Sequence, residues 1–432
     1  MLVIRSGEAA WRTTLEHLLD RMRTVPAEVD NTVRKIIDQV RVNGDAALFE
    51  YTRMFDGFDP AREGLVIGPE AIQRAWSDAP AALKEALKLA ARRIEAYHEH
   101  QKERSWFVAE GDGSITGQKV TPIDSVGIYI PGGANAFPST MLMNVIPARI
   151  AGVGRIEVVS PTPKGRVNEA LLAAAHASGV DRIVRIGGAQ AVAALAYGTE
   201  RVTRVDKVVG PGNIYVAHAK RLLQGVIGID SFAGPSEILV IADEHADPSV
   251  VANDLLSQAE HDAMASAILV TPSEPLLQGV LAAIERALET LPRREVIEKS
   301  LDHHGACIVV RDLDEAVEVA NVVAPEHLEL MVQDAWSYLG GIRNAGAVFL
   351  GYHTPEAIGD YVAGPNHTLP TSSTARFSSP LGVYDFTKRT SVVAVSRKAL
   401  ETLGPAAVLL ARSEELEAHA RSVECRLGKP HP

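Results

Sequence analysis

Val126-Gly-Ile-Tyr-Ile130 is a mainly apolar run that leads directly into the turn Pro131-Gly-Gly133. An apolar run of this length that ends at a glycine-rich turn is typical of a buried strand in a parallel sheet. A helical pattern of apolar residues follows from Ser139 to Ala151. Strand, tight turn and helix in this order form the unit from which we expect the fold to be built.

The same order recurs three more times. The later strand-like runs are 155–159, 182–186 and 205–209, and the helical patterns after them are 168–178, 189–197 and 214–223. A second series of apolar runs occupies 236–241, 267–270, 307–310 and 346–350. Two such series predict an α/β protein with two parallel sheets covered by helices, and two units of this kind usually leave a cleft between them.

The two ends of the chain read differently from this centre. Amphipathic patterns at 27–55 and 80–103 predict a mostly helical N-terminal region, and a small helical tail closes the chain. Because the tail is too short for a core of its own, it must dock on something, for example another subunit. We expect an N-terminal helical segment at 1–25, a first α/β domain at 26–126 plus 236–381, a second at 127–235, and the tail at 382–432.

The composition narrows the function classes. Lys and Arg total 43 against 54 Asp and Glu, so the formal net charge is -11, and no run of five basic residues occurs. Nucleic acid and anionic membranes are therefore poor partners, and a small molecule is the expected ligand. The sequence shows no signal peptide and no apolar stretch long enough to span a membrane, and its two cysteines fit a reducing compartment, so a cytoplasmic protein is expected.

Glycine-rich turns after the first series of strands suggest a ligand site. Ligands of parallel α/β sheets bind at the carboxyl ends of the strands, where backbone amides and helix N-termini attract phosphates. The residues expected on this rim are Tyr129, Gly132, Gly133, Gly188, Gln190 and Asn213. No turn fits G-x-G-x-x-G, so the dinucleotide fingerprint is absent, and glycines required only for turn geometry explain the pattern equally well.

Ser257-Gln-Ala-Glu-His-Asp262 closes a helical run that begins at Pro248. Gln258 and His261 are three residues apart and are expected on one face of the last turn, where an amide oxygen and an imidazole nitrogen can bind a divalent metal. A His near a helix C-terminus is also an ordinary partner for the helix dipole. The pair alone leaves both interpretations open.

Ala324-Pro-Glu-His327 follows a helical pattern that Pro325 ends, so a turn or a new helix is expected at Glu326. Adjacent Glu and His side chains make two proton acceptors that together span the pH range around neutrality. A Glu in the first turn of a helix beside a surface His is the structural alternative.

Two later stretches offer further donors. A polar loop of about twenty residues is expected from Gly359, and loops of this length are usually functional or disordered. It contains Asp360 and His367. On the last helix, Glu415 and His419 are four residues apart with Glu414 adjacent, which is also the spacing of an ordinary surface pair.

With these motifs in order, the chain from about Ala27 to Leu427 resembles the histidinol dehydrogenases, zinc- and NAD-dependent enzymes of the last two steps of histidine biosynthesis. The motifs that carry the resemblance are Gly127-Ile-Tyr-Ile-Pro-Gly-Gly133, Gly187-Gly-Ala-Gln190, Gly210-Pro-Gly-Asn213, Ala233-Gly-Pro-Ser-Glu237, Leu255-Leu-Ser-Gln-Ala-Glu-His261, Ala324-Pro-Glu-His327, Gly359-Asp360 with Asn366-His367, and Pro380-Leu-Gly-Val-Tyr384.

The resemblance implies a role for each matching position. Zinc ligands would be Gln258, His261, Asp360 and His419. The proton-transfer residues would be Glu326 and His327, and the NAD contacts Tyr129, Gln190 and Asn213. Substrate contacts would be Ser236, Gln258, His261, His327, Asp360, Glu414 and His419. It also implies two Rossmann-like domains without the usual glycine fingerprint and a homodimer whose C-terminal tails complete the partner's site.

The implied reaction is oxidation of an amino alcohol to an aldehyde and then to the acid, with His327 as base for the hydroxyl and Glu326 for the attacking water. A relative that oxidises another alcohol, such as a sulfonated diol, is the nearest alternative. A thiol-dependent aldehyde dehydrogenase would need a reactive Cys in a rim loop, whereas Cys307 lies in a strand-like run. A silent binding protein is disfavoured because no expected base or ligand is missing.

Overall fold

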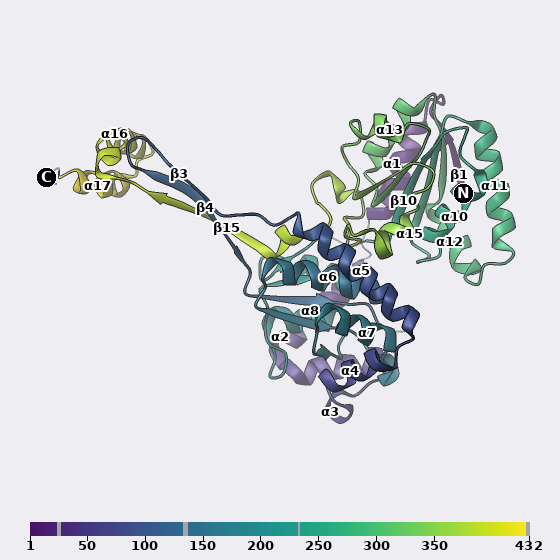
Figure 1. Cartoon of the computed structure of the whole chain (residues 1–432), viewed down its shortest axis with the longest axis horizontal. Helices are drawn as coiled ribbons and strands as arrows, with labels where there is room; N and C mark the ends of the chain where they lie inside the picture. Colours follow the sequence, from purple (N-terminus) through teal and green to yellow (C-terminus); the bar gives the residue numbers. More distant parts are fainter. Residues whose placement is uncertain (24–26, 133–136, 232–233, 429–432) are drawn as a thin grey trace. The chain divides into compact units, whose positions relative to one another are not determined.

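The computed structural model describes residues 1–23, 27–132, 137–231 and 234–428 (Figure 1). Gly133 and Ala233, which belong to two of the motifs, lie outside these residues. The chain forms two compact units: Met1–Gln101 with Ile123–Phe386, and Lys102–Pro122 with Thr387–Pro432. Within the described ranges, no helix is both long and apolar enough to cross a membrane.

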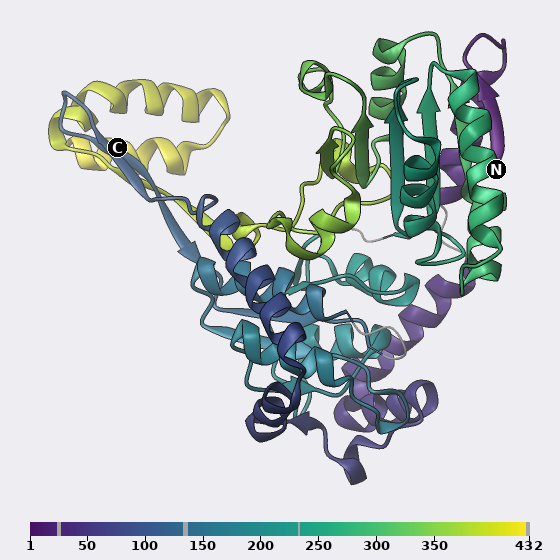
Figure 2. The same ribbon diagram turned by 45° about the vertical axis from the view of Figure 1, so that its right-hand side comes forward.

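The first sheet of the larger unit has six parallel strands in the order β1-β12-β11-β10-β13-β14. Its strands are β1 (Leu2–Arg5), β10 (Glu237–Ala242), β11 (Ser266–Thr271), β12 (Ala306–Val309), β13 (His327–Met331) and β14 (Ala347–Leu350). Its helices are α1 (Trp11–Arg23), α10 (Pro248–Ala259), α11 (Glu274–Leu288), α12 (Arg294–His304), α13 (Leu313–Val323) and α14 (Ala335–Leu339). Helices lie on both faces (Figure 2).

The continuous apolar runs of this sheet are explained by burial on both faces. Along β10, Leu239 and Ile241 belong to the core formed with α1 and α13. The alternate residues Ile238 and Val240 belong to the opposite core, formed with α10, α11 and α12. Side chains alternate between the faces of a strand, so a strand covered on both sides needs apolar residues throughout.

The second sheet of the same unit has the order β2-β7-β6-β5-β8-β9. Its strands are β2 (Val66–Ile67), β5 (Ser125–Tyr129), β6 (Arg155–Val159), β7 (Ile183–Val184), β8 (Lys207–Val209) and β9 (Gly228–Ile229). Its helices are α2 (Ala27–Asp56), α3 (Pro60–Glu63), α4 (Pro69–Asp78), α5 (Ala81–Glu99), α6 (Pro138–Ala151), α7 (Glu169–Ser178), α8 (Gly188–Tyr197) and α9 (Ile214–Leu223).

The helices α2, α4 and α5 pack on this second sheet rather than with 236–381, where the expected domain division placed them. Apolar residues of α2 share a core with α8 and α9, and those of α4 and α5 share one with α6 and α7. The edge strand β2 pairs antiparallel with β7. The difference arises because an amphipathic pattern shows that a helix buries one face but not which sheet receives it.

The smaller unit contains an antiparallel sheet that the sequence patterns did not predict. Its strands are β3 (Trp106–Ala109), β4 (Ile115–Pro122) and β15 (Thr387–Ala394), in the order β15-β4-β3, and its helices are α16 (Arg397–Ser413) and α17 (Glu417–Glu424). Most residues of β3 and β15 are exposed, so these strands lack the buried alternation by which a strand is recognised. The two expected tail helices are present.

A buried ion pair fixes the turn after β8. The Lys220 side chain, 1% exposed, forms an ion pair with Asp230 and donates a hydrogen bond to the Gly210 carbonyl oxygen at 2.9 Å. The Asp230 carboxylate accepts from the Gly210 amide at 2.8 Å. Both backbone groups of Gly210 are therefore satisfied by charged side chains, which hold the turn that leads to Asn213.

Replacing Lys220 by Met should destabilise the protein by about 3–5 kcal/mol, because it leaves a buried carboxylate without a counter-charge. Arg294→Met is the control, since it breaks an exposed pair with Glu298 on α12 and should change little. Urea unfolding followed by circular dichroism measures both. Equal midpoints for the two variants would contradict the structural role of Lys220.

Candidate active site

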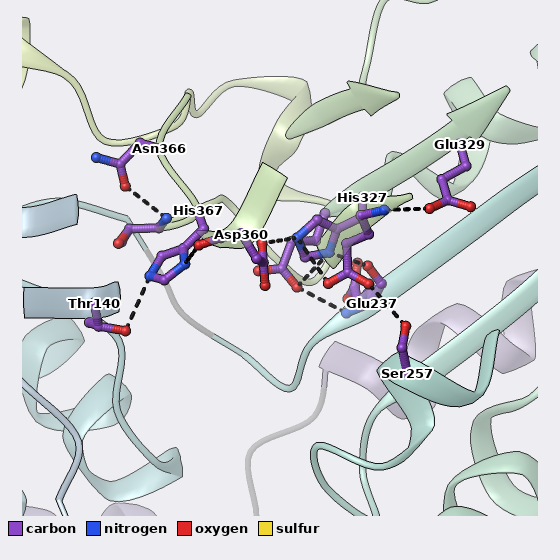
Figure 3. Close-up of polar contacts among 11 residues, drawn as sticks. Thr140, Glu237, Ser257, His327, Glu329, Asp360, Asn366 and His367 are labelled. Carbon is purple, nitrogen blue, oxygen red and sulfur yellow. Dashed lines mark hydrogen bonds and ion pairs between the residues drawn. The ribbon is translucent and has the colours of Figure 1, made fainter. Parts of the chain in front are cut away.

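The candidate bases Glu326 and His327 lie at the start of β13, at the amino-terminal edge of the first sheet and beside β10. Figure 3 shows His327 and the Glu237 side of β10 at this edge. His327 is the first residue of β13 and is the register partner of Ile238. The turn or helix start expected at Glu326 is therefore a strand start, and Ala324 closes α13 in a left-handed conformation (φ 51°). The helical alternative for this motif is wrong, because β10 supplies a pairing partner that the local sequence does not reveal.

One residue of β10 holds both candidate bases through its backbone. The Glu237 amide donates to Glu326 Oε2 at 2.9 Å, and the Glu237 carbonyl oxygen lies 3.0 Å from His327 Nδ1. Because a carbonyl oxygen only accepts, Nδ1 carries the proton. The neutral His327 ring therefore keeps its lone pair on Nε2.

The free nitrogen of His327 faces two carboxylates. Nε2 lies 3.7 Å from Glu356 Oε1 and 3.6 Å from Asp360 Oδ1. Burial lowers the pKa of His327, but the surrounding carboxylates outweigh it and raise this pKa well above the ordinary value of 6.5. Burial raises the pKa of Glu326 to about 8. Without a bound cation, His327 and Glu326 are thus both protonated at neutral pH.

Glu356 was missed by the sequence reasoning. It begins α15 (Glu356–Ile358), which continues into a π-helical turn at Gly359–Ala363, whereas a polar loop was expected from Gly359 onward. Burial raises the pKa of Glu356 to about 7. The available signal was its spacing: Glu356 precedes Asp360 by four residues, which places both carboxylates on one side of a helical turn.

A pair of buried acids, Glu329 and Asp254, holds Glu356 through its backbone amide. The Glu356 amide donates to Glu329 Oε1 at 2.7 Å, and Glu329 interacts with Asp254. Burial raises the pKa of Glu329 to about 9 and that of Asp254 to about 6. Two carboxyls this close cannot both be charged without a large cost, so the pair retains a proton at neutral pH.

Gln258 and His261 approach the same edge from α10. Gln258 lies in the last turn of the helix, as expected, whereas His261 lies two residues beyond its end. Gln258 Oε1 is buried and has no hydrogen-bond partner among the described residues. Burial lowers the pKa of His261, which keeps its imidazole neutral, the form that binds metals.

These donors fit a divalent cation. An unpartnered amide oxygen, a neutral imidazole and a carboxylate form the N/O donor set that suits zinc. His327, Glu356 and Asp360 also offer ligand atoms within 4.8 Å of one another. This edge therefore carries one carboxylate, Glu356, that the expected ligand set does not include. Of the four expected ligands, the larger unit supplies three, while His419 is exposed on α17 of the smaller unit, as is Glu414 at the end of α16.

The expected cofactor residues lie at the carboxyl ends of the strands of the second sheet, whereas the candidate bases lie at the amino ends of the strands of the first. Tyr129 ends β5, and its hydroxyl accepts from the Gly188 amide at 3.1 Å. Gln190 is buried in the first turn of α8, and its Oε1 has no partner among the described residues. Asn213 caps α9 by accepting from the Tyr215 amide at 3.1 Å, so its side-chain oxygen already has a structural role.

Hydrogen bonds tie the helices of the second sheet to the site. His367 Nε2 lies 3.1 Å from Thr140 Oγ1 on α6, and its Nδ1 lies 2.9 Å from the Asp360 carbonyl oxygen (Figure 3). The segment that carries Asp360 is thereby held against α6. Ser236, the remaining expected substrate contact, immediately precedes β10 and is half-buried.

The sequence and the fold have close relatives. The family profile described as histidinol dehydrogenase matches residues 19–427. The histidinol dehydrogenase of Pseudomonas fluorescens (strain Pf0-1) is 55% identical over 96% of this chain and 94% of its own, and that of Methylococcus capsulatus is 53% identical over 98% and 97%. The crystal structure of histidinol dehydrogenase from Elizabethkingia anophelis has a TM-score of 0.92 at 36% identity, covering 99% of this chain and 98% of that one. The chain therefore belongs to the histidinol dehydrogenase family.

Proposed function

We propose that this chain is the zinc-dependent enzyme that oxidises L-histidinol to L-histidine through L-histidinal, using NAD, in the last two steps of histidine biosynthesis. The observation that carries the proposal is the adjacent pair Glu326 and His327, held by the backbone N–H and C=O of Glu237 beside a cluster of metal donors. Two oxidations need two proton acceptors, and this pair supplies both. Such a pathway enzyme would work in the cytoplasm.

Zinc would be held by Gln258, His261 and Asp360 together with His419, and it would anchor the substrate's imidazole and amino nitrogens. The unpartnered Oε1 of Gln258 supports this assignment, because a buried acceptor without a donor is costly unless a ligand completes it. NAD would lie against Tyr129, Gln190 and Asn213 and accept the hydride in each oxidation.

His327 would act in the alcohol step. Its Nδ1 is fixed as a donor to the Glu237 carbonyl oxygen, so the proton of the substrate hydroxyl must go to Nε2. Asp360 and Glu356 face this nitrogen and stabilise the imidazolium that results. Substrate-binding residues would also include Ser236 and Glu414.

Glu326 would act in the aldehyde step by accepting a proton from the water that hydrates the aldehyde. Its pKa of about 8 makes it an acid at neutral pH in the metal-free protein. Positive charge entering the site lowers a carboxyl pKa, so Glu326 becomes a base only in the loaded enzyme. This dependence would couple water activation to occupancy of the site.

The enzyme would be a homodimer with shared sites, in which Glu414 and His419 come from the partner. The smaller unit exposes many large apolar side chains, as expected of a surface that a second copy covers. These include Trp106, Phe107, Val108, Val393, Leu409 and Leu410.

Thiol chemistry is disfavoured for Cys307. This residue is fully buried in β12, and burial raises the pKa of its thiol to about 12. A thiol nucleophile must be partly exposed and ionise near neutral pH. Cys307 therefore fits a core residue, as the sequence indicated.

Glu326→Gln should impair aldehyde oxidation far more than alcohol oxidation, by about 10²-fold or more in kcat, because the amide cannot accept a proton from water. Stopped-flow measurement of NADH formation from histidinol and from histidinal separates the steps. His327→Asn serves as the comparison and should impair the alcohol step. Equal losses in both steps of the Glu326 variant would refute this division of roles.

Mixing two inactive variants tests the shared site. His327→Asn and His419→Asn proteins should each be nearly inactive, and reassembly after partial denaturation should restore activity, because one of the two sites in a mixed dimer is intact. The restored activity should approach about a quarter of the wild-type value when subunits exchange at random, the arithmetic of one intact site in half of the dimers. No recovery in demonstrably mixed dimers would place the whole site in one chain.

Removing the metal should make stability depend on pH. The pKa of Glu329 is raised to about 9 from an ordinary 4.5, so the folded protein holds a proton that the unfolded chain releases as pH rises. The chelated protein should therefore lose unfolding free energy between about pH 5 and 9, by at least about 1 kcal/mol. Glu329→Gln should flatten this slope in urea unfolding series. A slope unaffected by the substitution would assign the dependence to other groups.

A further inference from the structure

Several buried polar atoms at the carboxyl edge of the second sheet have no hydrogen-bond partner among the residues that the structure describes. Ser160 Oγ and Thr162 Oγ1 follow β6, and Gln190 Oε1 lies in the first turn of α8. A small cavity is lined in part by Gly132, Ser160 and Thr162. Each buried polar group without a hydrogen bond costs about 1–3 kcal/mol, so such a group of atoms marks a place that a polar ligand completes.

Asp56, the last residue of α2, belongs to this edge. Its Oδ2 atom is buried and has no hydrogen-bond partner within the part of the chain that the structure describes. Burial raises the pKa of Asp56 to about 6. Its charge also acts on the Tyr129 hydroxyl, whose pKa is raised to about 12 mainly by burial. Tyr129 also packs in one core with Leu48 and Phe49 of α2, the helix that Asp56 ends, so Asp56 and Tyr129 lie in one neighbourhood.

The other buried acids around this sheet are engaged by cations. Among the described residues with an unpartnered oxygen, the pairs are Asp45 with Arg201, Glu157 with Arg182 and Asp230 with Lys220. No ion pair reaches Asp56 within the described ranges. A half-buried carboxyl without a cation or a donor among the described residues is an unsatisfied acceptor, which a bound ligand can complete.

The surroundings of Asp56 are rigid. Gly57 reverses the chain after α2 with a left-handed conformation (φ 59°). The Arg185 guanidinium then stacks on the Phe58 ring at 3.8 Å and donates to the Gly165 carbonyl oxygen at 2.9 Å. These contacts fix the segment after Asp56 over the ends of β6 and β7, so the carboxylate is held in place before any ligand binds.

We propose that Asp56 reads the ribose of the dinucleotide and sets the preference for NAD over NADP; this inference rests on the proposed function. A carboxylate can accept from both vicinal hydroxyls of a ribose, which would supply the donor that Oδ2 of Asp56 lacks. The 2′-phosphate of NADP would bring about two negative charges against it in a partly desolvated place. The fingerprint that usually supplies this acid is absent from the chain, and Asp56 reaches the edge from the preceding helix.

The test compares kcat/KM for NAD and NADP, with histidinol and zinc saturating, in wild type, Asp56→Asn and Asp56→Glu. Wild type should prefer NAD, and Asp56→Asn should lower the NAD:NADP ratio by about tenfold or more, since the amide cannot repel a phosphate. Asp56→Glu keeps the charge and should still reject NADP. Glu50→Gln removes an exposed charge from the same helix and should leave the ratio unchanged.

Competitive inhibition by 5′-AMP and 2′,5′-ADP provides a second readout, because it reports binding without turnover. Wild type should bind 5′-AMP more tightly than 2′,5′-ADP, and Asp56→Asn should reduce or invert this difference in affinity. Suppose that wild type reduces NAD, but that Asp56→Asn changes neither the NAD:NADP ratio of kcat/KM nor the ratio of the two inhibition constants by more than about twofold. The inference on Asp56 is then overturned while the proposed function stands. If wild type reduces neither dinucleotide with histidinol, the proposed function fails and the inference falls with it.

Discussion

The parallel pairing of β10 with β13 is the constraint on which the site depends. It brings the backbone of Glu237 against the start of β13, where its N–H binds Glu326 and its carbonyl oxygen binds the His327 ring. Both strands are buried on both faces, so the register is fixed by the cores on either side. The protonation of His327 thus follows from sheet geometry, and Nε2 is left for chemistry.

Around this pair the protein assembles an unusual amount of buried acid. Glu326, Glu329 and Glu356 all have pKa values raised by burial, and Asp360 remains ionised beside His327. Uncompensated burial of this kind is costly, and proteins retain it where function requires it. A site that binds a divalent ion and a cationic amino alcohol would return the missing positive charge. The acid cluster is therefore a physical argument for the metal, separate from the family resemblance.

Much of the fold was predictable because the strand, turn and helix units of a parallel sheet each have a recognisable local sequence pattern. Four strand, turn and helix units and a second series of apolar runs identified both sheets, and the structure confirms them. The antiparallel strands β4 and β15 escaped prediction because β15 is mostly exposed, β4 has no buried residue, and the two pair across more than 260 residues. The sheet on which α2 packs was also not predictable, since an apolar face does not identify its partner.

The site shows the same division between local and long-range information. Gln258 at the end of α10 followed from helical spacing, whereas the strand start at His327 depended on a partner strand remote in sequence. The rule that ligands bind at carboxyl ends of strands is the basis on which a cofactor edge is expected around Tyr129. This rule does not describe the first sheet, where the candidate bases lie at the amino end of β13. The end of α10 and the α15 segment bring the other donors to the same edge.

We propose that one zinc-dependent site performs both oxidations. The stoichiometry of NADH formed per L-histidinol consumed, measured on the protein as isolated, after chelation, and after zinc is returned, tests this proposal. We expect two NADH per histidinol, loss of activity with the chelator, and recovery with zinc. A ratio of one, or full activity in demonstrably zinc-free protein, would rule out a single zinc-dependent site for both steps.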